Sequence, residues 1–96
     1  MNLYVILSRN AWATPADLEQ AAARSTREGE ARSDDVRWIR SYVLGEEAGG
    51  LGTVCIYEAT SPEAIRAHAA AADLAVDEII PVADTVIVRP DPVAVA

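Results

Sequence analysis

The chain is short of the residue types on which charged, covalent or metal-dependent sites are commonly built. It contains no Lys, no Phe, one Cys and one His in 96 residues. The net charge is −7, and all 8 basic residues are Arg, which argues against nucleic-acid binding because that function needs clustered basic side chains. The single Cys excludes an internal disulfide and a zinc site made of Cys alone.

Long hydrophobic runs are also missing. Residues 3–7 form a short apolar run without the basic flank or the length of a secretory signal. No run approaches the roughly 20 apolar residues of a membrane span. We therefore expect a cytoplasmic protein that has neither a membrane nor a nucleic acid as its partner. Without Phe, the thin core of so small a domain must come from Val, Ile, Leu, Trp and Tyr.

What the sequence does contain is six periodic segments. Alternation and β-branched residues predict strands over residues 2–8, 36–44, 53–59 and 78–89. Thr14 and Ser61, each followed by Pro, predict the starts of two helices. The order strand, helix, strand, strand, helix, strand is that of the ferredoxin-like α+β fold, a four-stranded antiparallel sheet with both helices on one face. We expect one domain over residues 1–89 and a flexible tail over residues 90–96.

The two strands expected at the centre of the sheet are apolar on both faces. Leu3 and Val5 alternate with Tyr4 and Ile6, and the segment around Cys55 behaves in the same way. The helices would cover one face, so the other face needs a second cover. A second copy of the sheet is the simplest one, and we predict a two-fold homodimer packed through the sheet faces, a dimeric α/β barrel. In the second predicted strand, the alternation predicts that one face is shared by Val36, Trp38, Arg40, Tyr42 and Leu44.

The middle of the chain resembles a family of small domains of unknown function, some described as nickel-binding proteins. The resemblance covers roughly residues 36–82, and its matching positions are Trp38, Ser41, Tyr42, Val43, Cys55, Tyr57, Ala59, Glu63, Ile65, Arg66, His68, Ala69, Ile79 or Ile80, and Val82. It implies a ferredoxin-like fold, dimers of the α/β-barrel kind and metal binding. Two segments depart from the family pattern: the long Gly-rich hairpin over residues 45–52, and residues 73–75, where relatives often carry Gly-Phe-Pro.

His68 and Cys55 are the candidate metal ligands. A neutral imidazole is a common ligand for transition metals, and a thiolate is a soft one that suits nickel. The alternative for His68 is an inert, hydrogen-bonded histidine between helix and sheet. The alternative for Cys55 is a small buried hydrophobe. Alternation alone does not decide whether Cys55 faces the helices or the opposite side of the sheet.

Three aromatic side chains are the candidate ligand-binding residues. Trp38, Tyr42 and Tyr57 could line an apolar pocket and offer hydroxyl groups to a planar ligand. The alternative is that these rings fill the core or an interface, because the chain has no Phe to do so. Ser41 could donate a hydrogen bond, but no base accompanies it, so nucleophilic catalysis has no support.

Three hypotheses for the function follow. The first is a non-enzymatic cytoplasmic homodimer that binds nickel or another divalent transition metal through His68, with Cys55 or a tyrosine nearby. The second is an enzyme or small-molecule binder of the α/β-barrel kind, similar to monooxygenases or cyclases, with a cleft between helices and sheet. This one rests on analogy of fold. The third is a dimerising module without a site.

Overall fold

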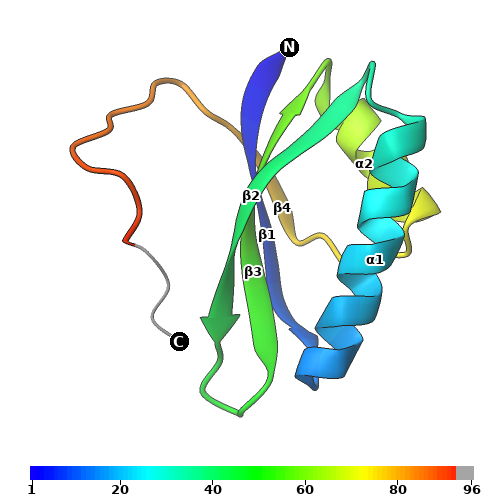
Figure 1. Ribbon diagram of the computed structural model, residues 1–96, viewed down its shortest axis with the longest axis vertical. Coiled ribbons are helices and arrows are strands. Elements are labelled where there is room, and N and C mark those ends of the chain that lie inside the picture. Colours follow the sequence, from blue (N-terminus) through cyan, green and yellow to red (C-terminus); the bar gives the residue numbers. More distant parts are fainter. Residues whose placement is uncertain (93–96) are drawn as a thin grey trace.

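The predicted ferredoxin-like fold is confirmed by the computed structural model, which describes residues 1–92 (Figure 1). The strands are β1 (Asn2–Trp12), β2 (Val36–Gly45), β3 (Leu51–Ala59) and β4 (Glu78–Pro81), and the helices are α1 (Pro15–Ala31) and α2 (Pro62–Ala71). The antiparallel sheet has the strand order β2-β3-β1-β4, with β1 and β3 in the centre as expected. Both helices lie on one face of the sheet.

The helices begin where their capping residues predict. The Thr14 hydroxyl accepts a hydrogen bond from the Asp17 amide at 3.2 Å, and the Ser61 hydroxyl accepts one from the Ala64 amide at 3.1 Å. Each cap satisfies one amide that the first turn of a helix leaves without a partner. The core between helices and sheet contains two rings and several small or branched side chains. Its buried members are Tyr4, Ile6, Val36, Tyr57, Ala59 and Ile65.

The last strand is shorter than predicted, and the first is longer. β4 ends at Pro81, which has no amide hydrogen to donate, and the last hydrogen bond to β1 runs from the Val82 amide to the Leu3 carbonyl at 3.0 Å. Residues 83–92 leave the sheet, and Val86 is 84% exposed. Asp91 then returns to β2, where it accepts a hydrogen bond from the Tyr42 hydroxyl at 2.7 Å. The predicted flexible tail, residues 90–96, lies partly outside the described residues.

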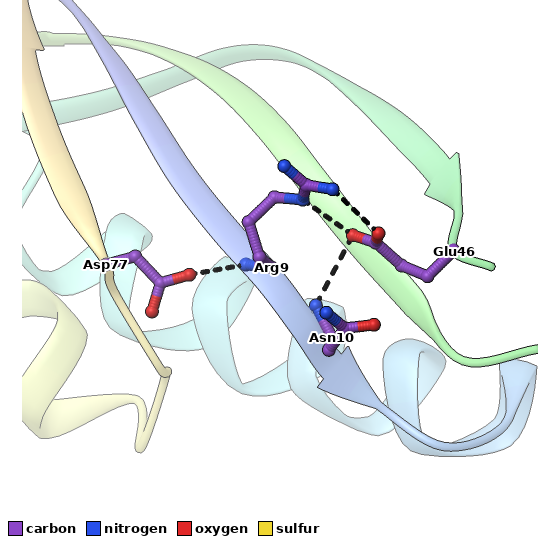
Figure 2. Close-up of polar contacts among 4 residues, drawn as sticks. All are labelled: Arg9, Asn10, Glu46 and Asp77. Carbon is purple, nitrogen blue, oxygen red and sulfur yellow. Dashed lines mark hydrogen bonds and ion pairs between the residues drawn. The ribbon is translucent and has the colours of Figure 1, made fainter. Parts of the chain in front are cut away.

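β1 continues past its predicted end because a polar clamp holds an irregular segment against β3 (Figure 2). The Arg9 guanidinium donates to both carboxylate oxygens of Glu46, at 2.8 and 2.9 Å. The Asn10 amide donates to the same carboxylate at 3.4 Å, and the Arg9 amide donates to Asp77 at 2.6 Å. Asn10 adopts a positive φ of 49°, a conformation that asparagine tolerates better than most residues. Glu46 opens the loop between β2 and β3, so the clamp ties this Gly-rich loop to β1.

Candidate functional site

A cleft of about 290 Å³ lies between the two helices and the face of the sheet that they cover. Thr53, Cys55 and Tyr57 alternate along β3 and form its floor. This places Cys55 on the helix side of the sheet, a question that the sequence left open. Trp38 and Val43 on the edge strand β2 border the cleft, yet they are 40% and 54% exposed, so it opens toward solvent along this edge. Other lining side chains come from β1, α1, α2 and the segment before β4, among them Ile6, Ser8, Trp12, Leu18, Ala21, Ala22, Ser25, Ile65, His68, Leu74 and Val76.

A β-bulge in β2 separates two residues that the sequence placed on one face. Trp38 pairs with Tyr57, but the next pair in register is Arg40 with Ile56, which leaves Ile39 as an extra residue. The inserted residue reverses the alternation, so the expectation of one shared face from Val36 to Leu44 was wrong. Trp38 and Ser41 face the helices, whereas Tyr42 lies opposite Val54 on the other face.

At the open side of the cleft, a short chain of hydrogen bonds holds the Trp38 ring. Its indole nitrogen donates to the Ser41 hydroxyl at 2.7 Å, and that hydroxyl donates to the Cys55 sulfur at 3.0 Å. The Trp38 ring also stacks on Tyr57, with centroids 6.2 Å apart and planes inclined by 11°. These contacts fix an aromatic wall at the mouth of the cleft although Trp38 is partly exposed.

Deeper in the cleft, Ser25 joins Tyr57 to His68. The Ser25 hydroxyl lies 3.0 Å from the Tyr57 hydroxyl and 3.0 Å from His68 Nε2. Either Tyr57 donates to Ser25 and Ser25 donates to Nε2 of His68, or a neutral His68 with its hydrogen on Nε2 donates to Ser25 and Ser25 donates to Tyr57. Both arrangements use a neutral imidazole. His68 is 2% exposed, and its Nδ1 has no hydrogen-bond partner among the described residues.

Burial keeps both titratable groups of this hydrogen-bonded chain, Tyr57 and His68, uncharged at neutral pH. It raises the pKa of Tyr57 to about 12, against the opposing effect of the Ser25 hydrogen bond. It also lowers the pKa of His68, and the positive charge of Arg32, which caps the C-terminus of α1, acts in the same direction. Glu28 on α1 opposes that shift. The inner end of the cleft is therefore polar but neutral.

Four of the five candidate residues named from the sequence line the cleft. They are Trp38, Cys55, Tyr57 and His68; Tyr42 lies on the opposite face of the sheet. Sequence reasoning missed the roles of Ser25 and Thr53. Ser25 had one usable signal, since it is the polar member of the helical stripe with Leu18, Ala21 and Ala22.

The donor atoms along the cleft decide whether it could hold a resident metal ion. Within residues 1–92, no three or more His, Cys, Asp or Glu side chains come together in a way that could hold a metal ion. Ser25 already occupies His68 Nε2, and Ser41 donates to the Cys55 sulfur. A nickel ion needs a fuller shell of donors than one imidazole and one thiol provide. The described residues of a single chain do not fit a resident nickel ion.

Fold and site together define a small ferredoxin-like domain with an aromatic, uncharged cleft under its helices. The chain belongs to the family of nickel-responsive SCO4226-like proteins, whose model matches residues 4–82. The resemblance seen in the sequence is thereby confirmed, and it extends over most of the chain. Comparison with curated proteins gives no match.

Among solved structures, the crystal structure of SCO4226 from Streptomyces coelicolor A3(2) is similar to this chain. The TM-score is 0.67 at 22% sequence identity, with 88% of this chain and 99% of that chain covered. At this identity the likeness shows the fold alone. No helix within the part of the chain that the structure describes has the length and apolar character needed to cross a membrane.

Proposed function

We propose that the protein is a non-enzymatic binding domain for a small, flat, uncharged organic molecule, held in the cleft between the sheet and the helices. The observation that carries this proposal is the cleft itself, about 290 Å³ in volume and bordered by the stacked rings of Trp38 and Tyr57. An apolar protein cavity of about 150 Å³ accepts benzene, so the space suits a molecule of one or two rings. Mostly apolar walls with a few placed polar groups are typical of ligand sites.

The charge of the cleft restricts the ligand to neutral molecules. His68 and Tyr57 are uncharged at neutral pH because burial shifts both pKa values away from 7. Among the described residues, the one carboxylate on the lining belongs to Glu19, an exposed residue of α1, and no Arg lines the cleft. A ligand with a charged group would therefore lose its hydration without gaining an ion pair. The net charge of −7 further disfavours anions.

A pair of neighbouring substitutions on α1 tests whether the cleft is the binding site. Ala22 lines the cleft and Ala23 is exposed, and leucine is a good helix former at both positions. We expect 2-naphthol, titrated by calorimetry, to bind the wild type and Ala23→Leu with equal affinity. Ala22→Leu should weaken binding at least tenfold, because its side chain fills the space. Absence of 2-naphthol binding to the wild type, or equal binding to both variants, would contradict the proposal.

Nickel is the second candidate ligand. Two observations favour it: the family is described as nickel-responsive, and His68 and Cys55 line the same cleft. The remaining donors would have to come from a second chain. Calorimetric titration with Ni²⁺ should then show binding that is lost in His68→Ala and weakened at low pH, where the imidazole is protonated. Binding that survives the substitution would exclude His68 as a ligand.

We further propose that the protein is a cytoplasmic homodimer, packed through the face of the sheet that the helices leave open. Of the described residues outside the sheet, Figure 1 shows on that side the extended segment over residues 83–92. The register places apolar side chains of all four strands there, and a reducing compartment would keep Cys55 as the free thiol that it is. The apolar residues of this open face are Leu3, Val5, Leu7, Tyr42, Leu44, Val54, Ile56 and Ile80, and the register also places Arg37, Arg40, Glu58 and Glu78 on it.

Sedimentation of the wild type and of Ile56→Arg tests the dimer. A buried interface of two such sheets does not accommodate an unpaired guanidinium, so the variant should sediment as a monomer. The wild type should have twice the monomer mass of 10.2 kDa. A wild-type mass near 10.2 kDa at micromolar concentration would refute this assembly.

A further inference from the structure

Thr53, a residue of the cleft floor, carries a buried hydroxyl group that has no partner among residues 1–92. Its side chain lines the cleft, the residue is 3% exposed, and Oγ1 makes no hydrogen bond to any described residue. The neighbouring polar groups of the cleft are paired. Ser8 donates to the Ala75 carbonyl at 2.6 Å, and Ser41 donates to Cys55. His68 Nδ1 also lacks a partner among the described residues, and its ring lies beside Gly29 of α1.

An unpartnered hydroxyl is a costly feature for a small domain. A buried polar group without a hydrogen bond costs roughly 1–3 kcal/mol, and native structures contain few of them. Valine has the shape of threonine and high strand propensity, so it would occupy position 53 of this central strand without that cost. The hydroxyl is explained if something that enters the cleft completes its hydrogen bond.

The spacing along β3 indicates how such a molecule lies. Thr53, Cys55 and Tyr57 share one face, and four residues of strand span about 13 Å. A molecule of two fused rings, with its oxygen at Thr53, would cover Cys55 and reach toward the stacked rings of Tyr57 and Trp38. The hydroxyls of Tyr57 and Ser25 already satisfy each other at that end. Among the Thr53, Ser25 and Tyr57 hydroxyls, the one whose hydrogen bond is unmet within the described residues is that of Thr53.

We propose that Thr53 is the specificity-determining residue of the cleft, and that the ligand is a flat molecule of one or two rings with a single neutral hydroxyl or keto oxygen placed against Thr53 Oγ1. This inference rests on the proposed binding function and names its ligand class. A ligand hydroxyl or carbonyl pairs with the threonine hydroxyl, which both donates and accepts. A carboxylate at the same place would be buried without a cation, because the lining formed by residues 1–92 contains no Arg.

The test compares the affinities of two probes, naphthalene and 2-naphthol, which differ by one hydroxyl group. The comparison is made in proteins with and without the Thr53 hydroxyl. The dissociation constants of naphthalene and 2-naphthol are measured by equilibrium dialysis for the wild type, Thr53→Val, Thr53→Ser and the exposed control Thr85→Val. In the wild type and in Thr53→Ser, 2-naphthol should be preferred over naphthalene. In Thr53→Val the preference should fall roughly three- to tenfold, the range of one neutral hydrogen bond. Thr85→Val should keep the wild-type preference.

The ratio of affinities separates the inference from the function on which it rests. If naphthalene binds and Ala22→Leu blocks it, while Thr53→Val leaves the preference unchanged, the cleft is a binding site and the role of Thr53 is overturned. If neither probe binds the wild type, the binding function fails and the inference fails with it. Tight binding of 2-naphthoate would also overturn the proposed ligand class. Should Thr53→Val not fold, Thr53→Ala removes the same hydroxyl and gives the same comparison.

Discussion

Gly52 is the position where a single methyl group should do the greatest damage to this fold. A Cβ built on Gly52 would lie 2.5 Å from Glu46 Oε1 and 2.6 Å from the carbonyl oxygen of Ser8. Real Cβ atoms essentially never come within 3.0 Å of such atoms. The Glu46 side chain can swing away only by giving up its hydrogen bonds to Arg9. The Ser8 carbonyl belongs to the backbone of β1, so the central strand itself must shift.

The size of the effect follows from that geometry. Overpacking a well-packed site costs typically about 1–3 kcal/mol, and a clash with backbone belongs at the upper end. We therefore expect Gly52→Ala to lower the free energy of unfolding by about 3 kcal/mol, a large share of the roughly 5–15 kcal/mol available to a small domain. For a chain of this length, the corresponding fall in Tm is roughly 15 °C.

Two other glycines of the same hairpin are matched controls. Nothing lies within 4 Å of a Cβ built on Gly45, and one built on Gly50 is 3.3 Å from the Trp12 carbonyl oxygen. Urea denaturation followed by fluorescence should rank the losses as Gly52→Ala, then Gly50→Ala, then Gly45→Ala, the last within about 0.5 kcal/mol of the wild type. Adding Glu46→Ala to Gly52→Ala should recover little, because the Ser8 contact remains. A Gly52→Ala protein as stable as Gly45→Ala would refute the reasoning.

Two further predictions concern pH. Burial lowers the folded-state pKa of His68 below its usual 6.5, so the unfolded chain takes up a proton at higher pH than the folded protein does. The free energy of unfolding should therefore decline as pH falls below 6.5. His68→Gln should remove this pH dependence of stability between pH 7.5 and 5.5, and an unchanged dependence would contradict the prediction. The hydrogen bonds from Arg9 lower the folded-state pKa of Glu46 below 4.5, so its contribution to stability should be complete above that pH and be lost as pH falls through the lowered value. Urea titrations of Glu46→Gln from pH 6 to 3 should show a shallower acid loss than the wild type, and identical curves would exclude this role for the clamp.

Local signals in the sequence were sufficient for the fold. The caps at Thr14 and Ser61, and the alternation in the central strands, each depend on neighbours within a few residues, and each appears in the structure as predicted. The β-bulge after Trp38 was not predictable in this way. Its inserted residue, Ile39, is apolar like its neighbours, so the pattern contains no break. Because of this one inserted residue, Tyr42 lies on the face of the sheet opposite to Trp38, whereas the alternation predicted that the two share a face.

The site was predictable only in part, because its chemistry depends on contacts between distant segments. His68, Cys55 and Trp38 were chosen as rare residue types, and all three line the cleft. Their pairing was not visible in the sequence, since Ser25 lies 43 residues from His68 and 32 from Tyr57. The sequence does not distinguish Thr53 from any other strand threonine, and only the structure shows that its hydroxyl has no partner among the described residues. Common polar residues become candidates only when their partners, or the lack of them, are known.

The small side chains of α1 explain why the cleft exists. Larger side chains at the same positions would fill the cleft, so ligand binding and stability make opposite demands on this helix. Four positions of α1 line the cleft apart from Glu19, and only Leu18 among them is large; the others are Ala21, Ala22 and Ser25. Ser25 is hydrogen-bonded to the Tyr57 hydroxyl of β3 and to His68 Nε2 of α2, so this stripe of α1 meets the other two elements through those side chains.

A domain with so thin a core would gain from filling this space. Burying a leucine side chain contributes roughly 1.5–3 kcal/mol, and Ala22 is partly open to solvent, so we expect Ala22→Leu to raise the free energy of unfolding by about 1 kcal/mol. Ala23→Leu, which points away from the cleft, should change it little. The variant that blocks 2-naphthol would then be more stable than the wild type, as expected where stability has been given up for a binding site. If Ala22→Leu instead destabilises the protein by more than Ala23→Leu, the space is already needed for packing, and the cleft has no room for a ligand.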